Sequence, residues 1–521
     1  MKKILLAFLL VLALTTTAFA GGEPGFLTSQ AAMLTAVAPG SSVLPIISVG
    51  DTLPNGYRFD TLPDGLAVLP NGNGTVDVFV NHETSLVPFP FTGNLATCTG
   101  PNCLSDFDNA QVSQLKLHQN SAGVLSGEFA LPGSANFQRF CSSFLADKSV
   151  GFQRPILFTN EEATDFVSPP PAPAWPADPA NQRQAGLVVA LDAINGKTYE
   201  IPGMGRMNHE NTIIVPGGWS QIVALTSDDT FSAPSSQLYM YLANSDTDML
   251  ADQGALYAFV SDNPAINDYG DLTSGMSISG HFIPVPRDIA IGDQTPLENW
   301  SNANNVFQFI RIEDLDFDKN NPRIVYFADT GEPRAVPDPT TGRLRRASSG
   351  TQGPYPNGRI FKAVFNASDP MVLDSLSVLI DADAGGYGNF NVPHNMDNVG
   401  ASKNSLMIQE DPGSHNSYNA GTPGAPTARI WMYNFATGAL TVVAAVDQSA
   451  DPAARLGAWE SSGVVDVSSV FGPGAWLVDI QAHSIFVDTE LRSVTGPGGV
   501  TGTLLFKREA GQLLLLRVPG S

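Results

Sequence analysis

Six short apolar runs in this chain each end directly in acidic, amide or imidazole side chains, and this recurrence limits the possible folds more than any other feature. The acids that mark the six ends are Glu83, Glu161, Asp228, Asp329, Glu410 and Asp479. Repeated strand units that stack around an axis bring equivalent strand ends to one mouth. The sequence therefore predicts an all-β fold, a six-bladed β-propeller with loop insertions between the blades, and a polar cluster at its mouth.

Turn-forming residues separate these runs, since the chain has 49 Gly and 39 Pro but only 15% charged residues. Segments 187–201 and 430–443 each predict a strand, a Gly-containing turn and a return strand. Segments 29–37 and 104–116 are the two candidates for short helices. The Pro-rich stretch 168–179 and the polar stretch 332–355 are the candidates for insertions.

The first twenty residues have the pattern of a secretory leader. Lys2 and Lys3 precede the apolar stretch 4–14, and the small-residue signal Ala18-Phe19-Ala20 follows. We expect cleavage after Ala20, export to the periplasm or the medium, and a single propeller domain over residues 21–521. No later stretch approaches twenty apolar residues, so no membrane span is expected.

The net charge of −23 argues against a protein that binds nucleic acid, because such proteins present Lys- and Arg-rich surfaces. The same charge suits a protein that binds cations, and simple solubility is the plainer explanation. We expect a monomer. Cys98 and Cys103 bracket a turn-prone loop and can pair in an oxidising compartment, which leaves Cys141 as a buried apolar residue.

Two Asn-His-Glu triplets, at residues 81–83 and 208–210, combine the ligands of hard cations with imidazole. In an extended segment the Asn and the Glu face one side and the His faces the other, so the His orients the site or packs in the core. The strand-end acids have an alternative role, since Asp after a strand commonly begins a turn. Their sixfold recurrence favours a functional cluster.

Further charged residues lie near these motifs. Arg206 precedes the second triplet and offers an anchor for phosphate or a partner for Glu210, while Arg311 and Glu313 share one face of a predicted strand. The sequence contains no Gly-x-Ser-x-Gly elbow, no phosphate-binding Gly-rich loop with Lys and no His-Glu-x-x-His helix. Metal-assisted hydrolysis is therefore the best enzyme class.

The order of these motifs resembles the PhoX-type alkaline phosphatases, an exported bacterial family. The segments that carry the resemblance are Val80–Glu83, Thr159–Glu162, Met204–Glu210, Asp228-Asp229, Leu238-Tyr239, Ile312-Glu313, Tyr326–Thr330, Asp397-Asn398, Trp459-Glu460 and Ile480-Gln481. The resemblance implies a six-bladed propeller with calcium and iron at its mouth and hydrolysis of phosphate monoesters. It implies Glu161, Glu210, Glu313 and Asp397 as ligands and Arg206 as a phosphate anchor or a ligand-side partner.

One departure concerns the metal. The family pattern Cys-Glu-Glu, whose Cys contacts iron, reads Asn160-Glu161-Glu162 here, and Asn favours calcium over iron. The candidate catalytic residues are Arg206 and Glu161. The candidate metal ligands are Glu83, Asn160, Glu161, Glu210, Asp228, Asp229, Glu313, Asp397 and Glu460.

Two functions remain open on this evidence. The first is an exported phosphatase that acts on small phosphorylated molecules through calcium, with or without iron. The second is a calcium-binding propeller that has lost the iron site and is non-catalytic or differently catalytic. A structural or adhesive surface protein has little support, because the chain has no sortase-type tail, second anchor or tandem modules.

Overall fold

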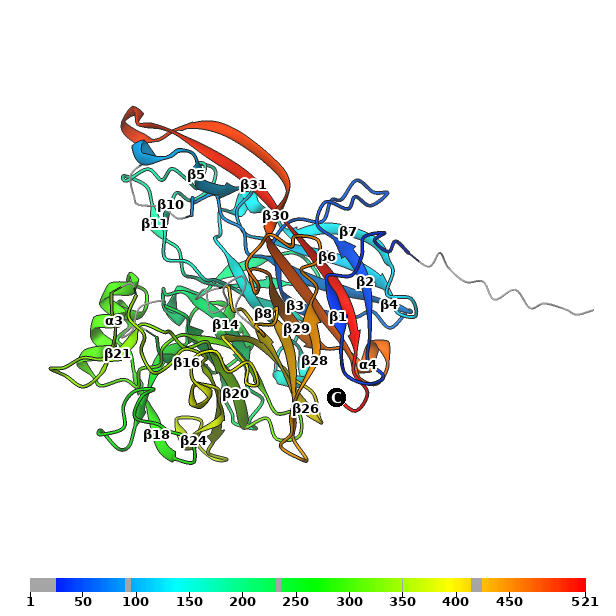
Figure 1. The fold of residues 1–521 in the computed structure, drawn as a ribbon. Helices are drawn as coiled ribbons and strands as arrows, with labels where there is room; N and C mark the ends of the chain where they lie inside the picture. Colours follow the sequence, from blue (N-terminus) through cyan, green and yellow to red (C-terminus); the bar gives the residue numbers. More distant parts are fainter. Residues whose placement is uncertain (1–24, 90–94, 231–235, 349, 414–423) are drawn as a thin grey trace, which may run out of the picture.

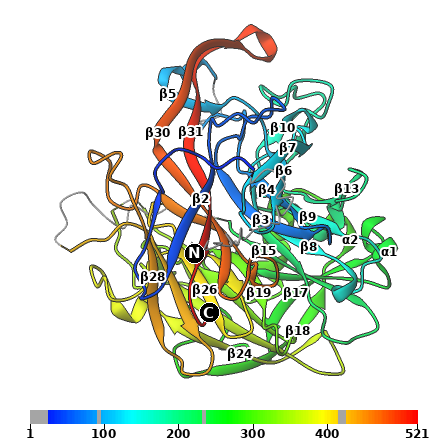
Figure 2. The same cartoon turned by 90° about the vertical axis from the view of Figure 1, so that its right-hand side faces the viewer.

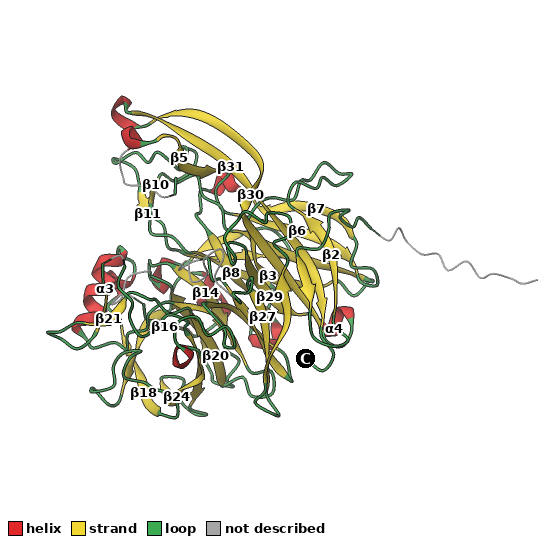
Figure 3. Ribbon diagram, viewed as in Figure 1, coloured by secondary structure: helices red, strands yellow, loops and turns green. Residues whose placement is uncertain are grey.

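The computed structural model describes residues 25–89, 95–230, 236–348, 350–413 and 424–521 (Figure 1). Strands dominate these residues, and the helices are few and short (Figure 3). No helix among them is long and apolar enough to cross a membrane. The predicted leader lies outside the described residues.

Antiparallel strands form six sets of four. We number the sets 1 to 6 in the order in which their first strands occur in the chain. Sets 1 and 2 comprise β3 (Pro63–Pro70), β4 (Thr75–His82), β6 (Gln111–His118) and β7 (Val124–Leu131), then β8 (Phe140–Ala146), β9 (Ile156–Glu161), β12 (Val188–Asp192) and β13 (Thr198–Glu200). Sets 3 and 4 comprise β14 (His209–Ile214), β15 (Ile222–Asp228), β16 (Leu238–Ala243) and β17 (Ala255–Ser261), then β19 (Ile312–Phe317), β20 (Ile324–Asp329), β23 (Arg359–Phe365) and β24 (Val372–Asp381). Sets 5 and 6 comprise β25 (Met396–Ala401), β26 (Ser405–Glu410), β27 (Arg429–Asn434) and β28 (Leu440–Val446), then β29 (Glu460–Asp466), β30 (Ala475–Thr495), β31 (Thr501–Arg517) and β2 (Ser42–Ser48).

The first strands of the sets surround a central channel. They contact one another in the cyclic order β3, β8, β14, β19, β25, β29 and back to β3. Each apolar run predicted from the sequence forms the second strand of a set, from β4 to β30. The predicted β-propeller is therefore confirmed, and we interpret each set as one blade.

Strands near the N-terminus complete the last two sets. β1 (Leu34–Ala36) pairs with β28, and β2 pairs with β31. Figure 2 shows β2 beside β31, so a strand near the start of the described chain pairs with one near its end. The hydrogen bonds between β2 and β31 thus close the ring, and they pair the edge of β31 that would otherwise be free.

Apolar side chains fill the space between neighbouring sets. Phe309, Phe327 and Phe361 pack against one another between sets 3 and 4, which β18 (Ser277–Pro284) joins into one sheet. At one end of the channel lies a cavity of about 850 Å³ that is lined from all six first strands, with Leu66 and Val399 on its wall. The acidic strand ends lie toward the other end, which we call the mouth.

The insertions lie mostly within sets. Stretch 168–179 belongs to the connection between the second and third strands of set 2, and stretch 332–355 to that of set 4. These connections carry β10 (Phe166–Val167) with β11 (Arg183–Gln184), and β21 (Ala335–Pro337) with β22 (Leu344–Arg346). Both stretches are therefore insertions, as expected, and they lie within sets. An insertion between sets is formed by α2 (Arg287–Ala290) and α3 (Gln294–Ala303), which separate sets 3 and 4.

Neither of the two helices predicted from the sequence is present, so both predictions are wrong. Segment 29–37 contains β1, and segment 104–116 contains parts of β5 (Thr99–Asp106) and β6. In both places pairing to a distant strand overrides a weak local preference. Two further short helices are α1 (Asp246–Leu250) and α4 (Ser468–Phe471), and the single 3₁₀ turns are Leu95–Thr97, Gly133–Ala135, Lys148–Val150, Pro202–Met204, Asp383–Gly385 and Pro497–Gly499.

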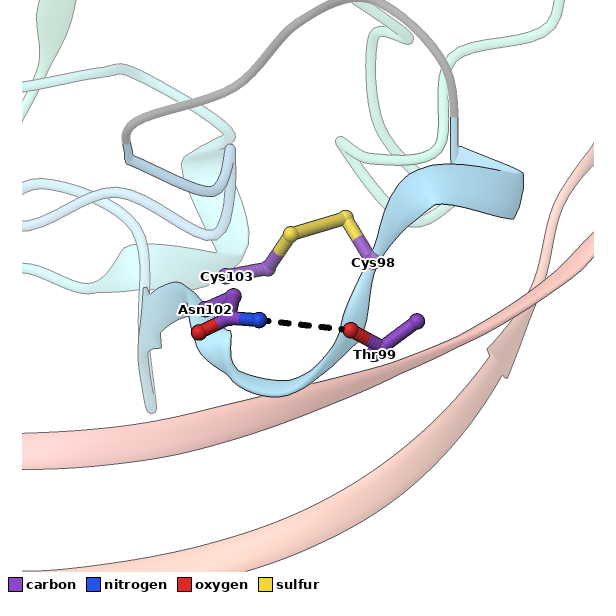
Figure 4. Close-up of a disulfide and its surroundings, with 4 residues drawn as sticks. All are labelled: Cys98, Thr99, Asn102 and Cys103. Carbon is purple, nitrogen blue, oxygen red and sulfur yellow. Dashed lines mark hydrogen bonds between the residues drawn. A yellow bond between two sulfur atoms is a disulfide. The ribbon is translucent and has the colours of Figure 1, made fainter.

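A long hairpin arm extends beyond set 6. The outer parts of β30 and β31 continue past the sheet, and β5 pairs with β31 in parallel there (Figure 1). A disulfide joins Cys98 to Cys103 across the turn at the start of β5 (Figure 4). Both cysteines are buried against Leu504 and Phe506 of the arm. The disulfide loop therefore supports the arm.

Candidate metal centre

A register shift near the start of each first strand shapes the mouth. In sets 1 to 5 the shift directly follows the first residue of the strand. Such β-bulges bend a strand and turn a side chain out of the regular alternation. The residues at the bulges, which we call the bulge ligands, are Asp64, Cys141, Glu210, Glu313 and Asp397. In set 6 the shift lies later, between Ser462 and Val464, and the strand begins with Glu460.

The ends of the second strands present two kinds of acid, because successive side chains of a strand face opposite sides. Residues that directly follow the last strand residue reach the mouth, as Glu83, Glu162 and Asp229 do. Residues one position earlier turn into their own set. The acids of this second kind are Glu161, Asp228, Asp329 and Glu410.

The acids that turn inward stabilise loops. Glu161 accepts hydrogen bonds from the backbone N–H groups of Gln138 and Leu187 at 2.9 and 3.1 Å, and it pairs with Arg183 at 2.9 Å. Asp228 accepts from the Thr230 hydroxyl at 2.6 Å and from its backbone N–H at 3.1 Å. Turn chemistry, the alternative considered from the sequence, therefore describes these acids best. The structure does not place Glu161 or Asp228 with the carboxylates at the mouth.

Both histidines of the Asn-His-Glu triplets are packing residues. His82 contacts the Thr61 carbonyl and the Ser113 hydroxyl through its two ring nitrogens, and His209 contacts the Thr226 hydroxyl and a backbone carbonyl in the same way. Both rings are fully buried. The triplets themselves are not equivalent, since the first ends β4 and the second begins β14.

Three groups of side chains at the mouth have the spacing of metal ligands. In each group the candidate ligand atoms lie within 4.8 Å of one another. The groups are Cys141 with Glu162 and Glu210, Asp64 with Glu83 and Glu460, and Glu210 with Glu313 and Asp397. We call them the thiol group, the outer group and the inner group.

The three groups form one continuous centre. Glu210 belongs to both the thiol group and the inner group. The Cys141 thiol lies 3.1 Å from a Glu210 oxygen and 3.3 Å from an Asp64 oxygen, which joins the thiol group to the outer group. Ser142 holds Glu210 by donating its hydroxyl at 2.7 Å.

Arg311 is the guanidinium that lies within this centre. It donates to both oxygens of Asp229, at 2.8 and 2.5 Å, and its Nη2 lies 3.3 Å from Glu313. Asp229 was expected to be a ligand, and the structure places it as the partner of Arg311 beside the inner group. Arg206 lies elsewhere, half-buried and donating to the Gln184 carbonyl at 2.6 Å.

The hairpin arm reaches the outer group through His483. The imidazole lies 2.6 Å from Glu509 of β31 and 3.5 Å from Glu460. Gln481, also on β30, donates to Asp64 at 3.1 Å and to Glu83 at 3.2 Å. Side chains of β30 thus orient all three carboxylates of the outer group.

Burial and mutual repulsion raise the pKa of the carboxyls at the mouth. Burial first, and Glu83 second, raise the pKa of Asp64 to about 8. Burial together with neighbouring carboxylates holds the pKa values of Glu210, Glu313 and Asp397 well above their usual range. The pKa of the Cys141 thiol is raised by the same two causes. A bound cation would remove this penalty, because it favours the charged forms.

Sequence reasoning missed Asp64, Cys141 and Glu162. Asp64 and Cys141 lie near the starts of strands, whereas the recurring motif in the sequence marks the ends of strands. A signal was available, because Asp64 and Cys141 each lie two or three residues before a short apolar stretch, which begins at Leu66 or Phe144. Asn160, expected as a ligand, turns its amide toward the Ser142 carbonyl at 3.4 Å, and its side-chain oxygen is buried without a partner.

No family model and no curated protein matches this chain. Among solved structures, PhoX of Pseudomonas fluorescens in complex with vanadate, a transition-state analogue, is similar with a TM-score of 0.59. The match has 14% identity and covers 95% of this chain and 98% of PhoX. A protein of unknown function from Dyadobacter fermentans matches with a TM-score of 0.40 and 10% identity over 92% of this chain and 100% of its own. At such identities the likeness to PhoX is one of fold.

Proposed function

We propose that this protein is a metal-dependent phosphoesterase that hydrolyses phosphate monoesters at the mouth of the propeller. The continuous centre of buried carboxylates and one thiol carries the proposal. A fold shared with PhoX, whose solved complex contains vanadate, supports it. Fold alone does not determine activity, so the side chains of the centre are the stronger argument.

The donor atoms suggest which ions the groups prefer. The outer group offers only carboxylate oxygens, which suit calcium. The thiol group adds sulfur, which suits iron better than calcium. The expectation that Asn160 removes the iron ligand is set aside in this proposal, because Cys141 supplies sulfur from the neighbouring strand. Calcium in the outer group and iron in the thiol group is our assignment.

Different residues of the centre would have different roles in hydrolysis. Glu210 belongs to two groups, so it would hold two ions close together. Arg311 orients Asp229 and Glu313, and its positive charge beside the inner group would help to hold a phosphate there. The bound ions would polarise the phosphate and lower the pKa of a bound water. We therefore assign the role first expected of Arg206 to Arg311.

The natural setting follows from the leader pattern. We propose export with cleavage after Ala20, and a small phosphorylated molecule as the substrate. The Cys98–Cys103 disulfide supports an oxidising compartment.

The second candidate function is a calcium-bound propeller without phosphatase activity. The outer group favours it, because three carboxylates held by Gln481 and His483 form a site that needs no reaction to explain it. Metal identity separates the two candidates. Calcium alone, with no hydrolysis, is the result that this alternative predicts.

Elemental analysis of the purified protein, combined with p-nitrophenyl phosphate hydrolysis, tests the proposal. We expect calcium and iron in the protein and activity that disappears in Glu313→Gln. Glu490→Gln, which changes an exposed acid of the arm, is the matched control and should retain activity. A metal-loaded protein that does not cleave the ester would refute the phosphoesterase.

A further inference from the structure

Asp479 of β30 is a buried carboxylate without a hydrogen-bond donor. Its side chain is 0% exposed, and neither of its oxygens has a partner among the described residues. Burying a carboxylate in this way costs several kcal/mol unless a counter-charge or donors compensate. Asp479 belongs to none of the three ligand groups at the mouth.

Three of the other five sets carry an amide at the position of Asp479, whereas sets 3 and 4 carry Ser227 and Ala328 there. On each second strand, regular pairing with the first strand is interrupted opposite the bulge. Asp479 is the residue of β30 at this interruption, directly after Val478, and Asn81, Asn160 and Gln409 hold the equivalent place in sets 1, 2 and 5. All three are amides that donate to a carbonyl at a bulge. Asn81 donates to the Cys141 carbonyl at 2.6 Å, and Gln409 to the Ser462 carbonyl at 3.3 Å. Set 6 has an acid where these sets have a donor.

The main-chain oxygen of Asp64 and the carboxylate of Asp479 approach the same point of the Gly463 backbone. A Cβ at Gly463 would lie 2.4 Å from the Asp64 main-chain oxygen and 3.0 Å from each Asp479 oxygen. Gly463 has a φ of 51°, so this backbone favours glycine, and the absence of a side chain lets the Asp64 carbonyl and the Asp479 carboxylate both approach the Gly463 backbone closely. The side-chain oxygen Oδ1 of Asp64 is also buried without a partner. Every one of these atoms is an acceptor.

We propose that Asp479 and the main-chain carbonyl of Asp64 bind a hard cation, of which calcium is the best representative, at the seam between sets 6 and 1. Carboxylate and carbonyl oxygens are the ligands that calcium takes in proteins, with water completing the shell. A cation contacts both Asp479 oxygens and the carbonyl together. A proton on Asp479 would satisfy one oxygen and leave the other without a donor. The ion therefore replaces the amide bridge that joins set 1 to set 2 and set 5 to set 6.

Asp479→Asn tests the seam site on the full mature chain. Asparagine has the same shape and restores the donor that sets 1 and 5 use, so the variant should fold. Both proteins are stripped with chelator and reloaded with calcium, and bound calcium is counted by elemental analysis. We expect one calcium fewer per chain in the variant. Calcium should also raise the melting temperature of the variant less than that of the parent.

Asp329→Asn is the matched control. Asp329 is an equally buried acid of a second strand, and the backbone N–H groups of Ile310 and Gly331 donate to it at 2.9 Å. Its calcium count should equal that of the parent. An equal count in Asp479→Asn would overturn the seam site. The result is independent of the phosphoesterase, since an inactive protein with no ions at the mouth would still lose its seam calcium.

Discussion

Cys141 lies at the same point of its strand as the acidic bulge ligands, so one strand position supplies donors from five sets. At this position the chemistry of a single side chain determines the ion. A carboxylate selects hard cations, whereas a thiolate selects softer ones. Cys141 is the one sulfur in the three ligand groups of the described residues.

Cys141→Ser should remove iron from the protein and leave calcium in place, because serine keeps the size but not the soft donor. We expect phosphatase activity to fall by more than the roughly 10- to 100-fold that outer-shell changes at metal sites cause. Elemental analysis and p-nitrophenyl phosphate hydrolysis measure the two effects. Ser143→Ala, on the same strand, is the control. Unchanged iron in Cys141→Ser would rule out the sulfur ligand.

Strands β9 and β15 show how an element sorts two neighbouring acids into different roles. The last strand residue turns into its own set, and the next residue reaches the mouth. A bulge on the paired first strand lies opposite this point. Because the alternation is strict, a shift of one residue exchanges a structural acid for a ligand.

Glu161 and Glu162 test this alternation as a pair. Glu161→Gln should lower the free energy of unfolding by about 3 kcal/mol, because it leaves Arg183 without its buried partner, and metal content should not change. Glu162→Gln should lower metal content with a smaller effect on stability. Urea unfolding and elemental analysis provide the two readings. Metal loss in Glu161→Gln alone would reverse the assignment.

The second strands could be predicted from the sequence because each is an unbroken apolar run, such as Ile156 to Thr159 before Asn160. Among the first strands the sequence predicts only the one that carries Arg311 and Glu313, because the bulges break the alternation where the candidate ligands lie. Arg206 and Arg311 illustrate the remaining limit. Both stand beside acids in the sequence, and only tertiary contacts place Arg311 with Asp229, 82 residues away.

At the scale of the whole molecule, the mouth concentrates negative charge that the fold alone does not neutralise. Asp64 has a pKa of about 8 in the folded chain and about 3.9 when unfolded. Between these values the ion-free folded state holds a proton that the unfolded state releases. The free energy of unfolding of chelated protein should therefore fall as pH rises from about 4 to about 8.

The slope should be about 1.4 kcal/mol per pH unit for each such carboxyl. Bound calcium holds the carboxylates charged, so the loaded protein should not lose stability in this range. Urea unfolding at pH 5 and pH 8, with calcium and with chelator, measures the difference. Equal pH dependence in both conditions would contradict a cation at the mouth.

Ring closure gives a further prediction at this scale. Ile47 of β2 is fully buried against the last set, and its replacement by Ala should cost about 2 to 5 kcal/mol. Val487→Ala in the arm, where the side chain is 39% exposed, should stay within about 0.5 kcal/mol. Thermal unfolding followed by circular dichroism compares the two. Equal stability would mean that β2 does not hold the ring.

The pairing of β2 with β31 also sets the order in which the molecule can be completed. Ser48 and Gln512 meet across this pairing although they are 464 residues apart in the chain. Contacts of such long range form slowly, because a large loop must close first. Until β31 has been synthesised, β2 has an unpaired edge that favours self-association. We expect chains that stop before residue 501 to aggregate, and completed synthesis to be the step that commits the chain to its native state.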